Sequence, residues 1–356
     1  MYFIYDKYYQ KHENGPSHPE NPERLEHIKL AVDSWSGADS IKYVKPFKAE
    51  EEQIGMVHDP EYIKRINDLS SQGDSSFLDV DTSVNQHTYS CALLAAGGCF
   101  KGLDLILRSG AVSSKFFLAC RPPGHHAFPS KGSGFCIFNN AALGARYARE
   151  KYGIRKIAII DFDAHHGNGT QEIFYGDDDV FYISFHQYPH YPGTGGPDET
   201  GYGRGQGFNL NLPFMPGTEE PDYIVSLIDI IMPLLGKYEP DLIIVSAGYD
   251  SHLSDHMSSL GLVEGSYRKI MLALSVFCRW TCKGRMGIVL EGGYDYRSTA
   301  DSAVSTISAC LEDSIIGKIK DIDDMEGYFE VDRDYRENRV RNHQALDRIK
   351  KNFNLN

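Results

Sequence analysis

The chain has 356 residues, of which 41% are hydrophobic and 24% charged, a composition typical of folded globular proteins and not of disordered ones. Its formal net charge of −13 argues against a nucleic-acid-binding surface, because contacts to phosphates need a basic footprint. Apolar stretches are interrupted by charges before they reach the ~18 residues of a membrane span, so we expect no membrane-spanning segment.

The N-terminus and the cysteines indicate the compartment. "MYFIYDKYYQK" lacks the apolar region and the small-residue cleavage site of a signal peptide. The seven cysteines form no CxxC pair and most lie in apolar runs, which indicates buried free thiols in a reducing environment. We therefore expect a cytoplasmic protein.

Five apolar runs of strand length end in polar loops. In chain order they are "FFLACRPPGHH", "KIAIIDFDAHH", "VFYISFHQYP", "DLIIVSAGYD" and "GIVLEGGYD". Helix-like segments at 140–151 and 223–237 lie between them. This alternation predicts an α/β fold with a mostly parallel sheet and helices on both faces. Ligands of such folds bind at the carboxyl ends of the strands, where all five polar clusters fall.

The end of the chain has a different composition. From Asp321 to Asn356 it is rich in charges and contains "VDRDYRENRVRNHQALDRIKKN", which predicts an exposed helix that closes the domain. Since no linker or change of composition marks a boundary before this tail, residues 1–356 are predicted to form a single domain.

The motif "DFDAHH" places polar groups, whose burial costs free energy, directly after a buried strand. In an extended chain Asp161, Asp163 and His165 would project to the same side. Carboxylate oxygens and imidazole nitrogens bind divalent metals, and Asp250 at the end of another strand is a natural third ligand. A lone Asp or His at a strand end more often caps a turn or fills the core. The gathering of several such groups favours a metal site.

Two further clusters suggest acid–base chemistry. His125 and His126 follow a stiff Pro-Pro pair and could serve as a base and its electrostatic partner. In "EGGYD" two glycines allow a sharp turn that presents Tyr294, whose hydroxyl could donate to a developing oxyanion.

These motifs together carry a family resemblance. "RPPGHHA", "GFCIFNN", "DFDAHHGNGTQEIFY", "PGTG", "SAGYD" and "EGGYD", in that order, resemble the zinc-dependent histone deacetylase and acetylpolyamine amidohydrolase superfamily. "HPENPERL" matches the N-terminal signature of that superfamily, and the resemblance runs from about residue 17 to about residue 295. Asn168 stands where class I enzymes carry an aspartate, so the chain is nearer to class II.

The resemblance implies an arginase-like α/β fold and a set of site residues. The implied zinc ligands are Asp163, His165 and Asp250; the oxygen-rich set would also accept Fe(II) or Co(II). The implied catalytic residues are His126 as general base and acid, His125 paired with Asp161, Asn168 behind His126, and Tyr294 as donor to the acyl oxygen. The implied walls of an acyl-lysine tunnel are Gly134, Phe135 and Tyr191, with Asp81-Thr82 near the substrate backbone.

The family also binds potassium, largely through main-chain carbonyls. The matching inner-site positions are Asp161, Asp163, His165, Ser184 and Phe185. The matching outer-site positions are Phe174, Asp177, Val180 and Phe208.

The substrate class remains open. The leading hypothesis is a zinc hydrolase that removes an acetyl or other short acyl group from an amine. Acetyl-lysine in proteins competes with acetylpolyamines, but the long N-terminal insertion of the polyamine enzymes is not evident between His58 and Ser90. An acyl-lysine binding module without turnover would be favoured by loss of Tyr294, which is present. An arginase-type ureohydrolase would need a second metal and more carboxylates.

Overall fold

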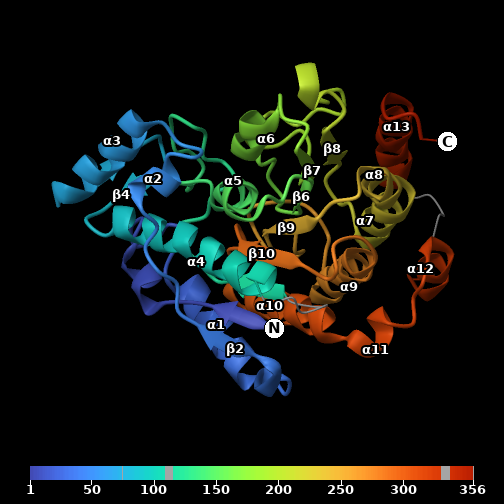
Figure 1. The fold of residues 1–356 in the computed structure, drawn as a ribbon, viewed down its shortest axis with the longest axis horizontal. Helices are drawn as coiled ribbons and strands as arrows, with labels where there is room; N and C mark the ends of the chain where they lie inside the picture. The colour runs from blue at the N-terminus through green and yellow to red at the C-terminus, as the bar shows by residue number, and fades with distance from the viewer. Residues whose placement is uncertain (74, 109–114, 330–336, 356) are drawn as a thin grey trace.

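The fold is built on a parallel β-sheet that runs through the middle of the molecule (Figure 1). The computed structural model describes residues 1–73, 75–108, 115–329 and 337–355. Within these residues the main sheet has eight strands in the order β2-β1-β5-β10-β9-β6-β7-β8, and every pair is parallel. The strands are β1 (Tyr2–Ile4), β2 (Lys42–Val44), β5 (Lys115–Leu118), β6 (Ile157–Asp161), β7 (Val180–Gln187), β8 (Asn209–Phe214), β9 (Leu242–Ala247) and β10 (Met286–Leu290). A short hairpin, β3 (Ser76–Phe77) and β4 (Ser83–Val84), lies apart.

Helices flank the sheet on both faces (Figure 1). Helices α4 and α5 pack on each other and on the central strands, while α9 and α10 form another packed pair that α1 joins. The helices are α1 (Glu23–Ser34), α2 (Glu51–Ile54), α3 (Pro60–Ser71), α4 (Thr88–Arg108), α5 (Asn140–Tyr152), α6 (Asn168–Phe174), α7 (Glu220–Ser226), α8 (Met232–Tyr238), α9 (Glu264–Thr281), α10 (Tyr296–Leu311), α11 (Asp313–Ile316), α12 (Ile322–Phe329) and α13 (Glu337–Asn352). A π-helical turn, Leu227–Ile231, joins α7 to α8.

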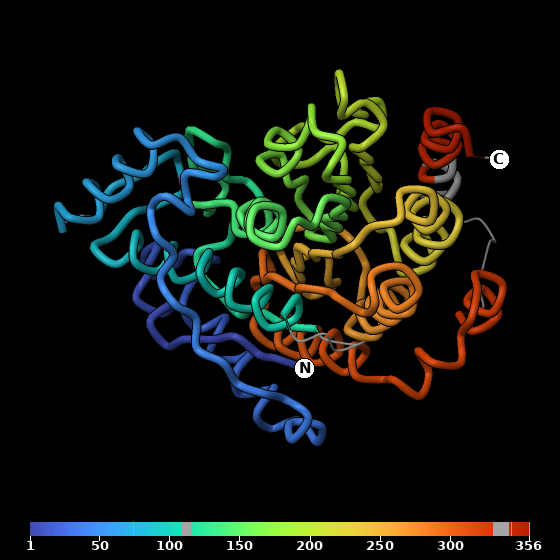
Figure 2. Tube along the Cα trace, in the orientation of Figure 1, coloured from blue at the N-terminus to red at the C-terminus, as the bar shows by residue number. Residues whose placement is uncertain are grey.

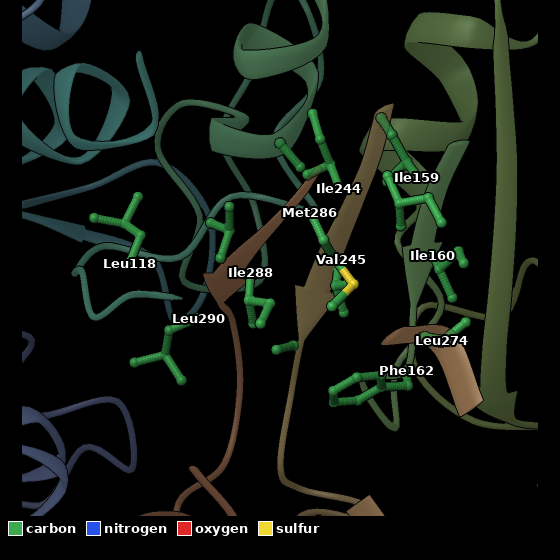
Figure 3. Close-up of a cluster of buried hydrophobic side chains, with 14 of the residues drawn as sticks. Leu118, Ile159, Ile160, Phe162, Ile244, Val245, Leu274, Met286, Ile288 and Leu290 are labelled. Carbon is green, nitrogen blue, oxygen red and sulfur yellow. The ribbon is translucent and has the colours of Figure 1, made fainter. Parts of the chain in front are cut away.

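The inner strands are apolar up to their carboxyl ends because helices cover both of their faces. Every residue of β6, β9 and β10 is buried, and Figure 3 shows side chains such as Ile159, Val245 and Ile288 in this core. Helix α4 is long and apolar enough to cross a membrane by length and composition. However, 72% of its most apolar window is buried inside the protein, as in the core helix of a globular fold.

The predicted α/β architecture is confirmed. The five predicted strands are β5, β6, β7, β9 and β10, which are neighbours in the sheet. Asp161 pairs with Ser184 on one side and Ser246 on the other, so β6 and β9 end at nearly the same level, while β7 continues beyond them to Gln187. The predicted helix at 140–151 is α5, whereas the segment 223–237 contains parts of α7 and α8 with the π-turn between them. Strands β1, β2 and β8 were not predicted.

The charged tail is only partly exposed. Its last helix, α13, lies beside α7 and β8 (Figure 2). Leu346 and Ile349 belong to the hydrophobic core, and Asn342 is buried where it donates to Thr218 Oγ1 and accepts from the backbone N–H of Met215. The prediction of an exposed helix was therefore wrong for the face of α13 that carries these residues. Residues 330–336 of the tail lie outside the described residues.

Candidate active site

Loops from the carboxyl ends of five strands meet around one cavity. The cavity has a volume of about 230 Å³. It is lined by Asp81, His126, Gly134, Phe135, His165, His190, Tyr191, Met257 and Tyr294. His126 follows β5, His165 follows β6, Tyr191 follows β7 and Tyr294 follows β10. The sheet edge therefore gathers the residues that the five sequence clusters carry, as expected for an open α/β sheet.

The predicted metal ligands lie together, and one of them, His165, lines the cavity. Nδ1 of His165 is 3.1 Å from Oδ1 of Asp163 and 2.9 Å from Oδ2 of Asp250. One potential ligand atom from each of the three residues lies within 4.8 Å of the others, and all three residues are buried. Two carboxylates and one imidazole at this spacing can hold a divalent ion with room for further ligands.

The local geometry that brings Asp163 and His165 together differs from the sequence prediction. Strand β6 ends at Asp161, and the chain then bends, so the three residues do not project from one extended segment. Instead, each aspartate turns the chain by accepting the backbone N–H two residues ahead. Asp161 Oδ1 accepts from Asp163 at 3.1 Å, and Asp163 Oδ1 accepts from His165 at 2.9 Å. A turn in which an aspartate side chain accepts the backbone N–H two residues ahead is an Asx turn, and two such turns follow each other here.

Glycines leave the space that the carboxylates occupy. A Cβ added to Gly248 would lie 2.0 Å from Asp163 Oδ2, and one added to Gly292 would lie 2.5 Å from Asp250 Oδ2. The N–H of Gly292 donates to Asp163 Oδ2 at 2.8 Å. The glycines of "SAGYD" and "EGGYD" are thus needed for the close approach of backbone to carboxylate.

The electrostatics of the three-residue group suit a cation. Burial, followed by repulsion from Asp163, raises the pKa of Asp250 to about 7. Although burial lowers the pKa of His165, the carboxylates of Asp250 and Asp163 raise it to about 10. Two buried carboxylates this close carry an excess of negative charge that a divalent ion would compensate. The residues present therefore fit a zinc ion.

The two adjacent histidines have different partners. His125 Nδ1 is 3.1 Å from Asp161 Oδ2, which also accepts from the hydroxyl of Tyr182 at 3.0 Å. His126 Nδ1 is 2.8 Å from Asn168 Oδ1. Burial opposes the charge on His125, but the Asp163 and Asp161 carboxylates raise its pKa to about 10. Burial and the neighbouring His125 and His165 hold the pKa of His126 well below its usual range.

Tyr294 and the predicted wall residues surround the cavity. Burial, followed by the Asp250 carboxylate, holds the pKa of the Tyr294 phenol well above its usual range, so the hydroxyl keeps its proton. The Phe135 ring packs edge-on against Tyr294 with centroids 5.8 Å apart. Phe135 itself has a φ of 69°, a strained backbone conformation that is often found at functional sites. Tyr191 is 45% exposed at the mouth, with its ring 5.2 Å from that of His126.

The predicted potassium positions fall in two places. Among the inner positions, Asp161 pairs with Ser184 across β6 and β7, and Phe185 is the next residue. The outer positions lie at the other end of β7, where Val180 begins the strand and Phe174 ends α6. The Asp177 carboxylate accepts from Arg146 and Arg149. Potassium binding stays a prediction.

Several residues that shape the site were not predicted. His190 and Met257 line the cavity, and Nε2 of His190 donates to the Met257 carbonyl at 2.9 Å. Asp255 accepts the backbone N–H groups of Tyr294 and Asp295 at 2.6 and 3.0 Å. The sequence gives little signal for Asp255 and Met257, because their loop, "SHLSDHMSS", resembles an ordinary polar connection.

A buried ion network supports the loops from behind. Glu20 accepts from Arg24 at 2.9 Å and from Arg121 Nη2 at 2.8 Å, and all three side chains are fully buried. Arg24 also donates to the carbonyls of Glu291 and Gly293 at 2.6 and 2.5 Å, and its guanidinium lies 4.8 Å from the centre of the Tyr294 ring. The "HPENPERL" motif thus tethers the loop that carries Tyr294.

Glu20→Ala is expected to lower the free energy of unfolding by about 3–5 kcal/mol, because it leaves two buried guanidinium groups without their shared carboxylate. Chemical denaturation monitored by circular dichroism measures this. Asp68→Ala, which removes one partner of the exposed Lys64–Asp68 pair, is the control and should change stability little. A Glu20→Ala protein as stable as the parent would contradict a structural role for the network.

The same network predicts a pH dependence of stability. Burial raises the pKa of Glu20, but Arg121 and Arg24 outweigh it and lower the pKa to about 2 from 4.5. A carboxyl group whose pKa is lower in the folded than in the unfolded protein stabilises the fold. This stabilisation is complete at a pH above the pKa of the unfolded state. That stabilisation is lost as the pH falls from about 4.5 toward 2. In Glu20→Ala this part of the acid-induced loss should be missing.

Comparisons with known proteins show the family to which the chain belongs. The family model for the histone deacetylase domain matches residues 18–310. A probable deacetylase of Archaeoglobus fulgidus is 41% identical over 293 residues, covering 82% of this chain and 80% of that protein. The polyamine deacetylase HDAC10 of Homo sapiens is 35% identical over 283 residues, covering 75% of this chain but 40% of that protein. The crystal structure of the HDA15 HD domain has a TM-score of 0.86 at 29% identity and covers 98% of this chain and 94% of its own. The chain therefore belongs to the histone deacetylase family of hydrolases.

Proposed function

We propose that the protein is a zinc-dependent amidohydrolase that removes an acetyl or other short acyl group from an acylated amine, with acetyl-lysine in proteins as the leading substrate. One observation carries this proposal. His126, His165 and Tyr294 line the same cavity, and His165 belongs to the buried group with Asp163 and Asp250. A base, a metal position and a hydrogen-bond donor thus face one space, which is the arrangement that amide hydrolysis needs.

Asp163, His165 and Asp250 would hold the zinc ion. The ion, when bound, supplies Lewis acidity that lowers the pKa of water and polarises the acyl oxygen. Fe(II) or Co(II) would be accepted by the same oxygen-rich ligand set. The remaining requirements of the reaction, which are moving protons and stabilising the developing oxyanion, fall to the side chains of this chain.

His126 is the proposed general base and acid. Its lowered pKa leaves the imidazole neutral at physiological pH, and Asn168 Oδ1 accepts the proton on Nδ1 at 2.8 Å. Nε2 is then the free basic nitrogen. It would take a proton from the attacking water and later give it to the leaving amine. His125, paired with Asp161 and protonated, supplies a nearby positive charge.

Tyr294 would donate its hydroxyl proton to the acyl oxygen as negative charge develops there. Gly134, Phe135 and Tyr191 line the cavity and would enclose the aliphatic part of the acyl-amine chain. Asp81 lies at the same cavity, where its carboxylate could accept an N–H of the substrate backbone. We also propose that the protein binds potassium at the positions predicted from the sequence and that it is cytoplasmic. The seven free, buried cysteines are compatible with a reducing environment.

Acetylpolyamines are the second candidate substrate class. Asp79 and Asp81 lie at the cavity and its rim, since Asp81 lines it and Asp79 accepts the N–H of Gly134 at 3.3 Å. Carboxylates there would attract a cationic amine. The similarity to a protein named polyamine deacetylase points the same way.

A turnover panel separates these possibilities. The zinc-loaded protein is offered acetyl-lysine peptides, acetylpolyamines and longer acyl-lysine peptides, and kcat/KM is measured for each. The proposal expects the acetyl-lysine peptides to have the highest value. A higher value for acetylpolyamines would move the substrate to the second class. No turnover of any acyl amide, combined with tight binding of an acyl-lysine peptide, would favour a binding module instead.

Tyr294→Phe tests the oxyanion donor. The change removes one hydroxyl and leaves the ring between Phe135 and Arg24. We expect kcat to fall ~10²–10³-fold with a much smaller rise in KM, because the hydrogen bond strengthens in the transition state. A zinc-chelating hydroxamate should still bind within about tenfold of the parent, since one neutral hydrogen bond contributes ~0.5–1.5 kcal/mol. An unchanged kcat would make Tyr294 a wall residue only.

A further inference from the structure

Glu291 is a buried carboxyl group to which the proposed reaction gives no role. It follows the last residue of β10 directly and is fully buried. Its Oε2 accepts the backbone N–H of Gly124 at 2.7 Å and that of His125 at 3.1 Å. Its Oε1 accepts from the hydroxyl of Ser246, at the end of β9, at 3.1 Å. One side chain thus joins the histidine loop to two neighbouring strands of the sheet.

We propose that Glu291 is a positioning residue that fixes the backbone of the His125–His126 loop for catalysis. This inference rests on the proposed function, because it assumes that His126 moves protons in amide hydrolysis. The side chains of this loop are held by Asp161 and Asn168. Those contacts set the orientation of the two rings, whereas Glu291 holds the main chain from which the rings extend.

The chemistry of the contact explains why an acidic residue stands here. Two N–H groups that point at one atom need an acceptor, and burying them without one would cost free energy. A carboxylate oxygen can accept both at once. A further anchor comes from Arg24, whose Nη2 donates to the backbone carbonyl of Glu291. The buried ion network is therefore connected to Glu291. We call the two contacts from Glu291 Oε2 to the N–H groups of Gly124 and His125 the clamp.

An acceptor oxygen, not a full negative charge, is what the clamp requires. Burial raises the pKa of Glu291 to about 7. The charge on His125 opposes this rise, and the charges on Asp161 and Asp163 add to it. A glutamine side chain has the same length and one carbonyl oxygen that can face the two N–H groups. Its amide nitrogen can donate to the Ser246 oxygen, which rotates to accept. Glu291→Gln should therefore keep the clamp, and Glu291→Met, of similar size, should lose it.

The kinetic test compares these variants in the full-length zinc-loaded protein. In Glu291→Met we expect kcat for an acetyl-lysine peptide to fall ~10–100-fold, the size of effect that a displacement of about 1 Å has on an aligned catalytic group. KM and zinc content should stay within a few-fold of the parent by the same argument that only alignment is lost. Glu291→Gln should restore kcat to within a few-fold. A glutamine variant as slow as the methionine variant, or a methionine variant as fast as the parent, would overturn the clamp.

A second measurement does not depend on activity. Hydrogen exchange is followed by mass spectrometry on a peptide that contains Gly124 and His125. Glu291→Met should lose protection of these two amides, Glu291→Gln should keep it, and Ser246→Ala should keep it because both N–H contacts to Oε2 remain. Unchanged protection in Glu291→Met would overturn the clamp even if the enzyme is active. If the parent hydrolyses no acyl amide, the proposed function fails while this readout still decides whether the clamp exists.

Discussion

Asp250→Ala or His165→Ala is expected to remove both the bound zinc ion and the deacetylase activity. The three ligand atoms lie within 4.8 Å of one another, and the loss of either residue leaves two protein ligands. A site with two ligands binds zinc far more weakly than one with three. Elemental analysis after dialysis, together with turnover of an acetyl-lysine peptide, measures both effects on the same sample. We expect zinc content near zero and no turnover.

The control is a variant in the other acidic group that could attract a cation. Asp177, Asp178 and Asp179 also lie close together, but Asp178 and Asp179 are only partly buried and all three carboxylates pair with arginines. Asp178→Ala should keep full zinc content and full activity. Full zinc occupancy in both Asp250→Ala and His165→Ala would show that other residues hold the zinc ion.

The parts of the fold that the sequence predicted are those with the strongest local signal. Strands β6, β9 and β10 are buried on both faces, so their sequences are continuous apolar runs that break sharply at polar residues. Strand β2 is an edge strand with exposed Lys42 and Tyr43, and β1 has only three residues. Strand β8, "NLNLPF", alternates asparagine with apolar residues. Pairing with a neighbour, which no local pattern records, is what makes these segments strands.

The candidate site also contains residues with a strong signal in the sequence, which were predicted, and residues without one, which were not. His125, His126, Asp161, Asp163 and Asp250 each follow an apolar run, and the parallel sheet brings such ends together without further information. The contact between Asp163 and His165 was expected for the wrong reason, since an Asx turn and not an extended strand produces it. The motif "EGGYD" did not indicate a role for Glu291. Glu291, like Asp161, is an acidic residue directly at the end of a buried strand, where burial without hydrogen-bond partners would cost free energy.

Long-range support could not be predicted because it joins residues that are far apart in the chain. Glu20 meets Arg121 across 101 positions, and Arg24 meets Gly293 across 269. A buried charge near the N-terminus has no local partner pattern beyond the i,i+4 pair of Glu20 and Arg24. The motif that contains them therefore indicated a family without indicating what the two side chains do.

His126→Ala is expected to abolish most turnover while zinc stays bound. His126 lines the cavity but is not part of the group formed by Asp163, His165 and Asp250. The loss of a general acid–base residue typically costs ~10²–10⁴ in rate, and one residue serving both steps should fall toward the upper end. Elemental analysis should find the zinc content of the parent. The exposed His27→Ala is the control for loss of an imidazole and should keep both zinc and activity.

The pH profile adds a check on the assignment. A base must be neutral to accept a proton, and burial, followed by the charge on His125, holds the pKa of His126 well below its usual range. The acid limb of kcat/KM in the parent should therefore lie below the usual histidine value of ~6.5. His125→Ala removes one of the nearby positive charges, so it should move this limb to higher pH and leave a residual rate. A His126→Ala enzyme within a few-fold of the parent would exclude His126 as the base. If the acid limb does not move in His125→Ala, His126 would still be the proposed base, but His125 would not be the group that lowers its pKa.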